Sequence, residues 1–555
     1  MSSPVDHFSL IDYLLFMVVF FVSLSIGLYY SRKVKGRETI NEYLFAGNQM
    51  KILPVSCSLV ATAISGSLII GFSMEVYAYG LHSCMYLILC PFLGLAVHYI
   101  FLPIFYELKL MSTFMYLEMR FDKSMRYFAS GLYYFQGFLI ISLSIYVPAF
   151  LFQEVTGINF YVVAIVAGLL CTWYTAIGGI RAVMWTDVFQ SVLIFVSTII
   201  ILTVGIIAVS GVYNVWEALK RGQRLSIFKT ELNLEQRGSI WAYIFSTSLM
   251  MMFQGISQSS VQRFCSLPSL AKAKTAMWIQ VIAFHVFLFL QLCGGATIYA
   301  IYETCDPLTS GAVRKLDQIY AHFVQEKASL FTGFNGIFIA GLFAGGLSTA
   351  STVFNTMSGT IYVDFFSERM EGSSEVKKSR TVKILVFIIG ILGISMIFLI
   401  ERLGTVFVIM IQIMSICTVA TFGFFINGIL IPRVNSKGAK CGAIVSILTI
   451  GILMFGSLGK KPDPMLPLRI DGCEYLNKSI PIEPQAFSSS IDDPSSDIPW
   501  IFRINFQFYC IIGLIMNISV SYIVSAITGW NVVEDQRLLA PFLRKKTVTG
   551  ENLLN

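Results

Sequence analysis

Long apolar runs separated by short polar segments are the main pattern of this chain. Residues 52–74, 188–212 and 329–363 contain no Asp, Glu, Lys or Arg. A helix needs about 20 apolar residues to cross the hydrocarbon core of a bilayer, and each of these runs is long enough. The pattern therefore predicts an all-α membrane protein in which many helices cross the bilayer.

The same pattern continues along most of the chain and predicts about thirteen spans. Their expected starts lie near residues 11, 52, 83, 128, 160, 187, 241, 277, 330, 383, 404, 439 and 505. An odd number of spans places the two ends of the chain on opposite sides of the membrane.

Basic residues in short loops predict the orientation, because Lys and Arg collect in the cytoplasmic loops of membrane proteins. The loops after the first, third and ninth spans hold such clusters: Arg32, Lys33, Lys35, Arg37, Lys109, Arg120, Lys123, Arg126, Lys377, Lys378, Arg380 and Lys383. We therefore expect an extracellular N-terminus and a cytoplasmic tail with Arg544, Lys545 and Lys546. One longer loop opposes this topology, since it would be external and yet contains Lys220, Arg221, Arg224, Lys229 and Arg237.

Composition supports a membrane location and argues against other classes. The 555 residues are 56% hydrophobic and 13% charged, and the mean hydropathy is +0.73. The net charge of +7 does not predict a nucleic-acid partner, because the basic residues stand in clusters between apolar runs. The chain contains no Walker loop, metalloprotease His-Glu pattern or paired-Cys motif, so we expect neither an enzyme nor an organic cofactor.

Two cysteines and a glycosylation motif stand in loops that are predicted to be external. Most of the eleven cysteines lie inside apolar runs, where cysteine is usually a small buried apolar residue. Cys305 and Cys473 do not, and they are the candidates for a disulfide. The loop 457–500 is rich in Pro, Ser and Asp, and its sequon Asn477-Lys478-Ser479 predicts N-glycosylation.

Small and polar residues interrupt the run 52–74, which contains Ser56, Ser58, Thr62, Ser65, Gly66, Ser67 and Gly71. They weaken a continuous helix and would free backbone carbonyls near Ala61 and Ile64. At membrane depth a break is tolerated only where it is buried or lines a cavity. Two interpretations stay open, a broken helix that binds a ligand and close helix packing through small residues.

Four hydroxyl groups stand close together in the run 329–363. Gly345 and Gly346 are followed by Ser348, Thr349, Ser351 and Thr352, which helical geometry places on an arc of about 160°. Each hydroxyl could bond to a carbonyl of the preceding turn. Together they could instead coordinate a hard cation, which prefers oxygen ligands.

Asp187 is the third candidate for a functional residue. It follows Gly178-Gly179-Ile180-Arg181 at the start of a long charge-free run. It would either stabilise a helix N-terminus at the membrane interface or point inward, where a carboxylate normally faces a cation or a proton path.

Several motifs resemble those of the sodium/solute symporters, and within them the branch of the monocarboxylate, multivitamin and iodide transporters. The resemblance extends over about residues 10–450. Its most specific motifs are Tyr174-Thr175-Ala176-Ile177-Gly178-Gly179-Ile180-Arg181-Ala182-Val183, Trp185-Thr186-Asp187, Leu347-Ser348-Thr349-Ala350-Ser351-Thr352 and Val261-Gln262-Arg263-Phe264.

The resemblance implies a LeuT-like core of two inverted five-helix repeats, each with a discontinuous first helix, here near residues 52 and 241. The implied units are an N-terminal segment with the first flanking helix, the first repeat, the second repeat, two flanking helices with an external loop at about 457–500, and a cytoplasmic tail. They cover residues 1–50, 51–212, 213–435, 436–530 and 531–555.

The resemblance also implies two sodium sites near the midplane of the membrane. One would use the carbonyls of Ala61, Ile64 and Gly345 with the hydroxyls of Ser348 and Thr349. The other would use Asp187 with Ser351 and Thr352.

Six residues correspond to the substrate pocket of the family: Ala63, Leu68, Met250, Gln254, Thr421 and Phe425. Leu68 stands where iodide-type members have a polar amide, and Ala78 replaces a basic residue that is common in this branch. We therefore do not expect iodide as the substrate.

The resulting hypothesis is sodium-coupled symport by alternating access, with Na⁺ as the transported coupling ion. The expected substrate is a monocarboxylate or a vitamin-like organic anion, and the expected location is the plasma membrane. The alternative is a non-transporting sensor or a channel on the same fold. A membrane-embedded enzyme comes third, because no nucleophile, acid/base pair or metal cluster is recognisable.

Overall fold

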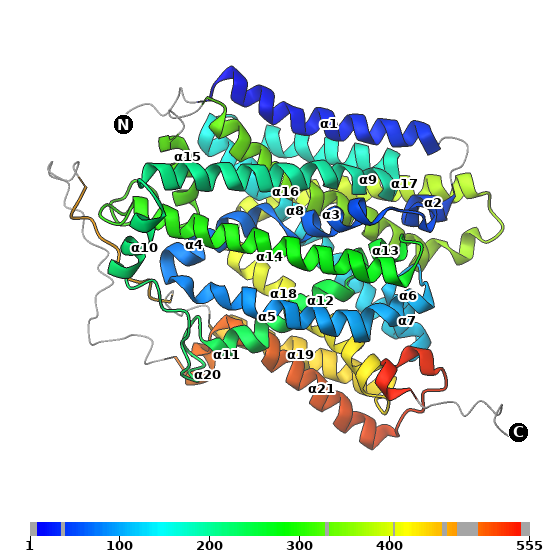
Figure 1. The fold of residues 1–555 in the computed structure, drawn as a ribbon. Helices are drawn as coiled ribbons and strands as arrows, with labels where there is room; N and C mark the ends of the chain where they lie inside the picture. Colours follow the sequence, from blue (N-terminus) through cyan, green and yellow to red (C-terminus); the bar gives the residue numbers. More distant parts are fainter. Residues whose placement is uncertain are drawn as a thin grey trace, which may run out of the picture.

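The protein is described by a computed structural model that covers residues 8–34, 39–327, 332–402, 406–457, 463–473 and 498–544. Within these ranges the regular structure is entirely helical, and the longest helices run side by side (Figure 1). Ten helices in the described ranges are long and apolar enough to cross a membrane, and eleven if one bent pair counts as a span. A helix bonds its own backbone polar groups, which is why it can cross a lipid phase.

The first broken helix is confirmed. Helices α3 (Ile52–Ala63) and α4 (Gly66–Tyr79) meet at a bend of 59°. Ile64 is extended, with φ −101° and ψ 97°, and Ser65 begins α4 as its N-cap by accepting a hydrogen bond from the N–H of Leu68. Of the two interpretations of this run, the broken helix is therefore the one that the structure supports, with Ser65 as the N-cap of its second part.

Helix α9 (Phe160–Ala208) joins two of the expected spans in one element of 49 residues. A straight helix of that length would be about 73 Å long, more than twice the thickness of the hydrocarbon core. Gly179, with φ 59° and ψ −165°, breaks it in two. The second part begins there and not near residue 187 as expected, because this left-handed conformation favours glycine.

The remaining helices follow the expected order. They are α1 (Leu10–Val34), α2 (Ile40–Phe45), α5 (Met85–Ala96), α6 (Leu102–Leu108), α7 (Thr113–Arg120), α8 (Lys123–Thr156), α10 (Val212–Arg221), α11 (Ile240–Ala242), α12 (Ser248–Ile256), α13 (Gln258–Cys265), α14 (Leu270–Ile301), α15 (Gln318–Lys327), α16 (Phe334–Ile361), α17 (Glu375–Arg402), α18 (Val406–Leu430), α19 (Ser436–Gly456), α20 (Trp500–Arg503) and α21 (Tyr509–Thr528). The expected span near residue 241 is divided among α11, α12, α13 and a π-helical turn. The total of thirteen spans stays a prediction.

Helix α16 is the centre of the bundle (Figure 1). In the most apolar part of the span Phe334–Phe366, 94% of the residues are buried inside the protein, compared with 33% in α1. Helices α9, α8, α1 and α3 pack around α16. Its hydroxyl-rich sequence therefore faces protein and not lipid.

The two ends of the described chain lie on opposite faces of the bundle. In Figure 1, α1 begins at the left end of the helices, and the last described residues, coloured red, lie at the right. This arrangement agrees with an odd number of spans.

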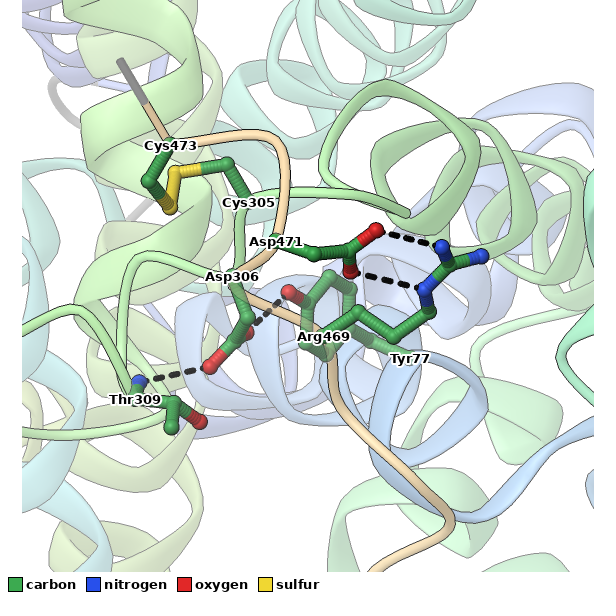
Figure 2. Close-up of a disulfide and its surroundings, with 7 residues drawn as sticks. All are labelled: Tyr77, Cys305, Asp306, Thr309, Arg469, Asp471 and Cys473. Carbon is green, nitrogen blue, oxygen red and sulfur yellow. Dashed lines mark hydrogen bonds and ion pairs between the residues drawn. A yellow bond between two sulfur atoms is a disulfide. The ribbon is translucent and has the colours of Figure 1, made fainter. Parts of the chain in front are cut away.

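A strap formed by residues 463–473 crosses the face of the bundle on which α1 begins. The N–H of Leu466 donates to the carbonyl of Ala78 at 2.9 Å, and the N–H of Asp306 donates to the carbonyl of Arg469 at 2.8 Å. Figure 2 shows the predicted disulfide between Cys305 and Cys473, which confirms that pairing. Asn477 lies outside the described residues, so its glycosylation stays a prediction.

Three of the five basic residues in the loop that opposed the expected topology bind other parts of the protein. Arg221 forms an ion pair with Glu303 at 2.7 Å, and Arg237 forms one with Glu75 at 2.5 Å. Arg224 is fully buried and donates to the carbonyl of Tyr77. Because these cations bind protein groups, they are weak indicators of orientation.

Replacing Cys305 by Ser should free the strap and lower the stability of the protein by about 2–4 kcal/mol, because the disulfide closes a long loop. Thermal unfolding in detergent would measure this loss. Cys441→Ser is the matched control, since Cys441 is an exposed free cysteine. Equal unfolding temperatures for the Cys305 variant and the control would contradict the structural role of the disulfide.

Candidate functional site

The break between α3 and α4 lies directly against α16. A Cβ atom added at Gly345 would lie 3.0 Å from the carbonyl oxygen of Ile64 and 3.3 Å from the nitrogen of Gly66. Glycine at this position therefore allows the backbone of α16 to reach the break. The hydroxyl of Thr349 lies 3.0 Å from the carbonyl of Gly345 and 3.5 Å from that of Thr62.

Three residues of the first expected sodium site, Ile64, Gly345 and Thr349, lie at this contact, whereas the carbonyl of Ala61 accepts from the N–H of Ile64 and the hydroxyl of Ser348 bonds to Asp187. Ala61 and Ile64 come from the end of α3, and Gly345, Ser348 and Thr349 from the facing turns of α16. Each is buried. The contact combines backbone carbonyls with hydroxyls, which is the oxygen-rich surrounding that a hard cation prefers.

Asp187 lies next to this contact and is completely buried. Its Oδ1 accepts a hydrogen bond from Ser348 at 2.6 Å, and its Oδ2 accepts one from Ser58 at 2.5 Å. The alternative in which Asp187 stabilises a helix N-terminus at the interface is therefore wrong, because the break at Gly179 leaves it inside the second part of α9.

Arg263 on α13 completes the cluster and was given no role by the sequence analysis. The guanidinium donates to Ser58 through Nε at 2.6 Å and also donates to Thr352. It lies 3.5 Å from Oδ2 of Asp187. Both charged side chains are almost fully buried, so each is the other's main compensation.

One feature of the sequence could have marked Arg263 as a functional residue. Arg263 belongs to the motif Val261-Gln262-Arg263-Phe264, where it stands between two expected spans. Only the tertiary structure, which packs the short helix α13 against α16 and α3, gives it a carboxylate partner.

The structure arranges the predicted hydroxyls of α16 in three ways. Ser348 bonds to Asp187, whereas Ser351 donates back to the carbonyl of Ser348 at 3.1 Å. Thr352 lies 2.9 Å from the hydroxyl of Thr62 and accepts from Arg263. Asp187 and Thr352 are thus linked through the guanidinium. The assignment of these oxygens to two sodium sites stays a prediction.

The cluster contains one carboxylate, one guanidinium and several neutral oxygens. Among the described residues, no group of three or more His, Cys, Asp or Glu side chains could hold a metal ion. Carbonyls and hydroxyls with a single negative charge suit a monovalent cation better than a multivalent one, because little charge is available to replace its hydration.

The expected substrate residues divide between two regions. Ala63 and Leu68 flank the break and are half-buried, beside one apolar cluster. Phe425 on α18 belongs to another cluster, where its ring packs against Phe105 and Tyr116.

The other three substrate residues are less well defined. The hydroxyl of Thr421 is buried and has no hydrogen-bond partner within the described part of the chain, so it is available to a ligand or a water. The side chains of Met250 and Gln254, on α12, lie outside the described residues.

Removal of one member of the buried ion pair should destabilise the protein strongly. Arg263→Met leaves Asp187 as an uncompensated buried charge, which should cost about 3–5 kcal/mol of stability. Adding Asp187→Asn to that variant should restore much of the loss. Thermal unfolding of the purified variants would test this cycle, with Lys272→Met, an exposed lysine of α14, as the control. A single Arg263 variant as stable as the parent would contradict the pairing.

Known sodium-coupled transporters are similar to this chain over most of its length. The model of the "Sodium:solute symporter family" matches residues 43–446. The sodium-coupled monocarboxylate transporter 2 of Bos taurus is 31% identical over 531 residues, which cover 95% of this chain and 85% of that protein. The sodium-dependent multivitamin transporter of Oryctolagus cuniculus is 30% identical and is covered to 71%, with 81% of this chain matched.

Solved structures of transporters share the fold. A Na⁺-coupled sialic acid symporter in its substrate-bound outward-open state superimposes with a TM-score of 0.75 at 20% identity, and the match covers 94% of this chain and 99% of that one. The nucleobase-cation-symport-1 family transporter MHP1, in a closed conformation, gives 0.52 at 11% identity, covering 89% and 96%. The all-helical, LeuT-like transporter fold predicted from the sequence is confirmed.

Proposed function

This chain belongs to the sodium:solute symporter family, and from that membership we propose that it uses the sodium gradient to carry a small organic anion across the plasma membrane. It is a multi-pass membrane transporter and not an enzyme. The observation that supports the proposal most directly is the contact between the broken helix α3–α4 and the hydroxyls of α16, with Asp187 beside it.

Sodium would occupy two places in this cluster. The first is the contact of the Ala61 and Ile64 carbonyls with Gly345, Ser348 and Thr349. The second is Asp187 with Ser351 and Thr352, where Arg263 now bonds to Thr352. A sodium ion at the second place would have to move the guanidinium aside, so that ion binding and the position of α13 are coupled.

The substrate class follows from the relatives and from the charges near the break. The matched proteins include monocarboxylate and multivitamin transporters. Helix α4 begins at the break, so its N-terminal N–H groups direct partial positive charge towards the site. A carboxylate would be balanced by this helix end, by sodium and by Gln254, in a pocket with Ala63, Leu68, Met250, Thr421 and Phe425.

Alternating access would couple the inward movement of sodium to that of the substrate. External sodium stabilises the outward-open state, substrate binds between the two broken helices, and the bundle then opens to the cytoplasm. Each positive charge carried through the full membrane field contributes about 2.3 kcal/mol per 100 mV. This orientation places the N-terminus outside and the C-terminus inside, with the strap 463–473 on the extracellular face.

Uptake of radiolabelled short-chain monocarboxylates, biotin and pantothenate into expressing cells tests the proposal. We expect at least one to accumulate in sodium medium and not in choline medium, because only the sodium gradient supplies the driving force. Accumulation also separates a symporter from a sensor or channel, which would give currents or a leak without concentrating the solute. No sodium-dependent accumulation of any of these anions would count against the proposed substrate class.

The sodium ligands have their own test. The double variant Ser348→Ala, Thr349→Ala should lose most sodium-dependent uptake, because it removes two expected sodium ligands, the hydroxyl that bonds to Asp187 and the hydroxyl beside the Thr62 carbonyl. Thr360→Val is the control, since its hydroxyl is also buried on α16 but donates only to the carbonyl of Thr356. An unchanged dependence of uptake on sodium concentration in the double variant would refute this ligand set.

A further inference from the structure

The short helix α7 has no part in the transport mechanism proposed above. It has eight residues and lies at the right in Figure 1, at the end of the bundle where the described chain ends. A helix of this size is about 12 Å long, too short to cross a membrane. It nevertheless buries the polar side chains of Thr113, Tyr116 and Arg120, which need partners from other elements.

The first residue of α7 is bonded to α13, the last part of the second expected broken span. Oε1 of Gln258 accepts hydrogen bonds from the N–H of Thr113 at 2.7 Å and from its hydroxyl at 3.0 Å. Nε2 of the same amide donates to the carbonyl of Met111 at 3.2 Å. Gln258 is 4% exposed and Thr113 is 2% exposed. Separation of α13 from α7 would therefore leave several buried polar groups without partners, which is costly.

Helix α6 holds the other end of α13. The hydroxyl of Tyr106 donates to the carbonyl of Leu267 at 2.9 Å, just beyond the last residue of α13. Only residues 109–112 separate α6 from α7. One continuous segment of the chain thus binds α13 at both of its ends, so α13 moves together with this segment or breaks buried hydrogen bonds.

The last residue of α7 is bonded to the end of α18. Nε of Arg120 donates to the carbonyl of Gly428 at 3.0 Å, and its Nη2 donates to the carbonyl of Pro432 at 2.9 Å. The same Nη2 reaches the carbonyls of Ile431 and Val434. The final carbonyls of a helix have no partner within the helix and carry partial negative charge. A buried guanidinium satisfies both needs, so it fixes α7 firmly to α18.

The tail segment, residues 536–543, is attached at the same place. The hydroxyl of Tyr116 donates to the carbonyl of Leu538 at 2.8 Å, and the N–H of Ala540 donates to the carbonyl of Ile429 at 3.1 Å. Leu538 is 3% exposed and Ala540 is fully buried. The tail segment is therefore packed against α7 and α18 at once.

Helix α13 also reaches the sodium cluster. Arg263 follows Gln258 by five residues in the same helix and donates to Ser58 and Thr352. A helix of only two turns moves as one body, because its backbone is held by its own hydrogen bonds. A shift of Arg263 that makes room for a cation would therefore be carried to Gln258 and from there to α7.

We propose that α7 is a coupling element, which transmits the movement of α13 from the sodium cluster to the end of α18 and to the tail segment. Gln258 and Arg120 act as positioning residues, because neither belongs to the proposed sodium or substrate sites and each joins α7 to one partner. The inference rests on the proposed sodium sites, since sodium supplies the movement of α13.

Hydrogen exchange of the full-length protein in nanodiscs tests the coupling in the absence of substrate. Exchange of the backbone amides is measured by mass spectrometry in sodium chloride and in choline chloride at equal concentration. Three segments report the response: residues 258–265 of α13, residues 428–434 at the end of α18, and the tail segment. In the parent protein sodium should change the exchange of all three, because α7 carries the movement from the first to the other two.

Gln258→Met keeps a side chain of similar length but removes the three hydrogen bonds to Met111 and Thr113. Sodium should still change the exchange of α13 in this variant, whereas the responses of 428–434 and of the tail segment should be lost. Thr113→Val removes only the hydroxyl bond and should reduce these two responses. It decides the question if Gln258→Met does not fold by size-exclusion chromatography. Gln280→Met is the matched control, since Gln280 is a buried glutamine of α14, and all three responses should persist in it.

Four results are contrary to the proposal. A parent protein in which sodium changes only α13 would overturn the coupling and leave the sodium sites standing. Folded Gln258→Met or Thr113→Val with all three responses intact would reduce the contact to packing. A loss of the two distant responses in Gln280→Met as well would indicate a general loosening of the bundle. No response of any segment in the parent would instead contradict the proposed sodium sites, and the coupling with them.

Discussion

The need to satisfy backbone polar groups inside the membrane is the constraint on which this structure depends. A helix that breaks at membrane depth exposes carbonyl and N–H groups to a medium without water, and each of them is costly unless another part of the protein covers it. The break at Ile64 and Ser65 is covered by α16, which is the most enclosed of the candidate spans in the described part of the chain. Gly345 makes that cover possible, because any side chain would separate the two backbones.

The same arrangement explains why the charged residues of the site can be buried. Asp187 accepts hydrogen bonds from Ser348 and Ser58 and lies beside Arg263, so its charge is both solvated by hydroxyls and balanced by a cation. Such a pair is weak evidence for stability, since desolvation offsets most of its attraction. The pair also ties three helices together, because Asp187 belongs to α9, Ser58 to α3 and Arg263 to α13.

Paired charges hold the connecting segments together at both ends of the bundle. At the end where α1 begins, the disulfide-bonded strap and ion pairs such as Arg237 with Glu75 hold the loops together. At the other end, Arg181 of α9 forms an ion pair with Glu42 of α2 and donates to the carbonyl of Ala46. Charge thus serves internal structure on both faces.

The sequence alone determined the class of the protein, the order of most of its helices and the hydroxyl-rich turn at Ser348, and it marked the run 52–74 as a candidate for a helix break. These features are local, because apolar length, glycine and small polar residues act through the backbone of their own segment. Only the tertiary structure decided which oxygens meet. It turned Ser348 towards Asp187 and Ser351 back to its own helix, it placed the bend of α9 at Gly179, and it brought Arg263 from a separate short helix into the cluster. The reason is that a hydroxyl or a guanidinium takes its partner from whichever helix packs against it, and that choice is made by the whole bundle and not by any one segment.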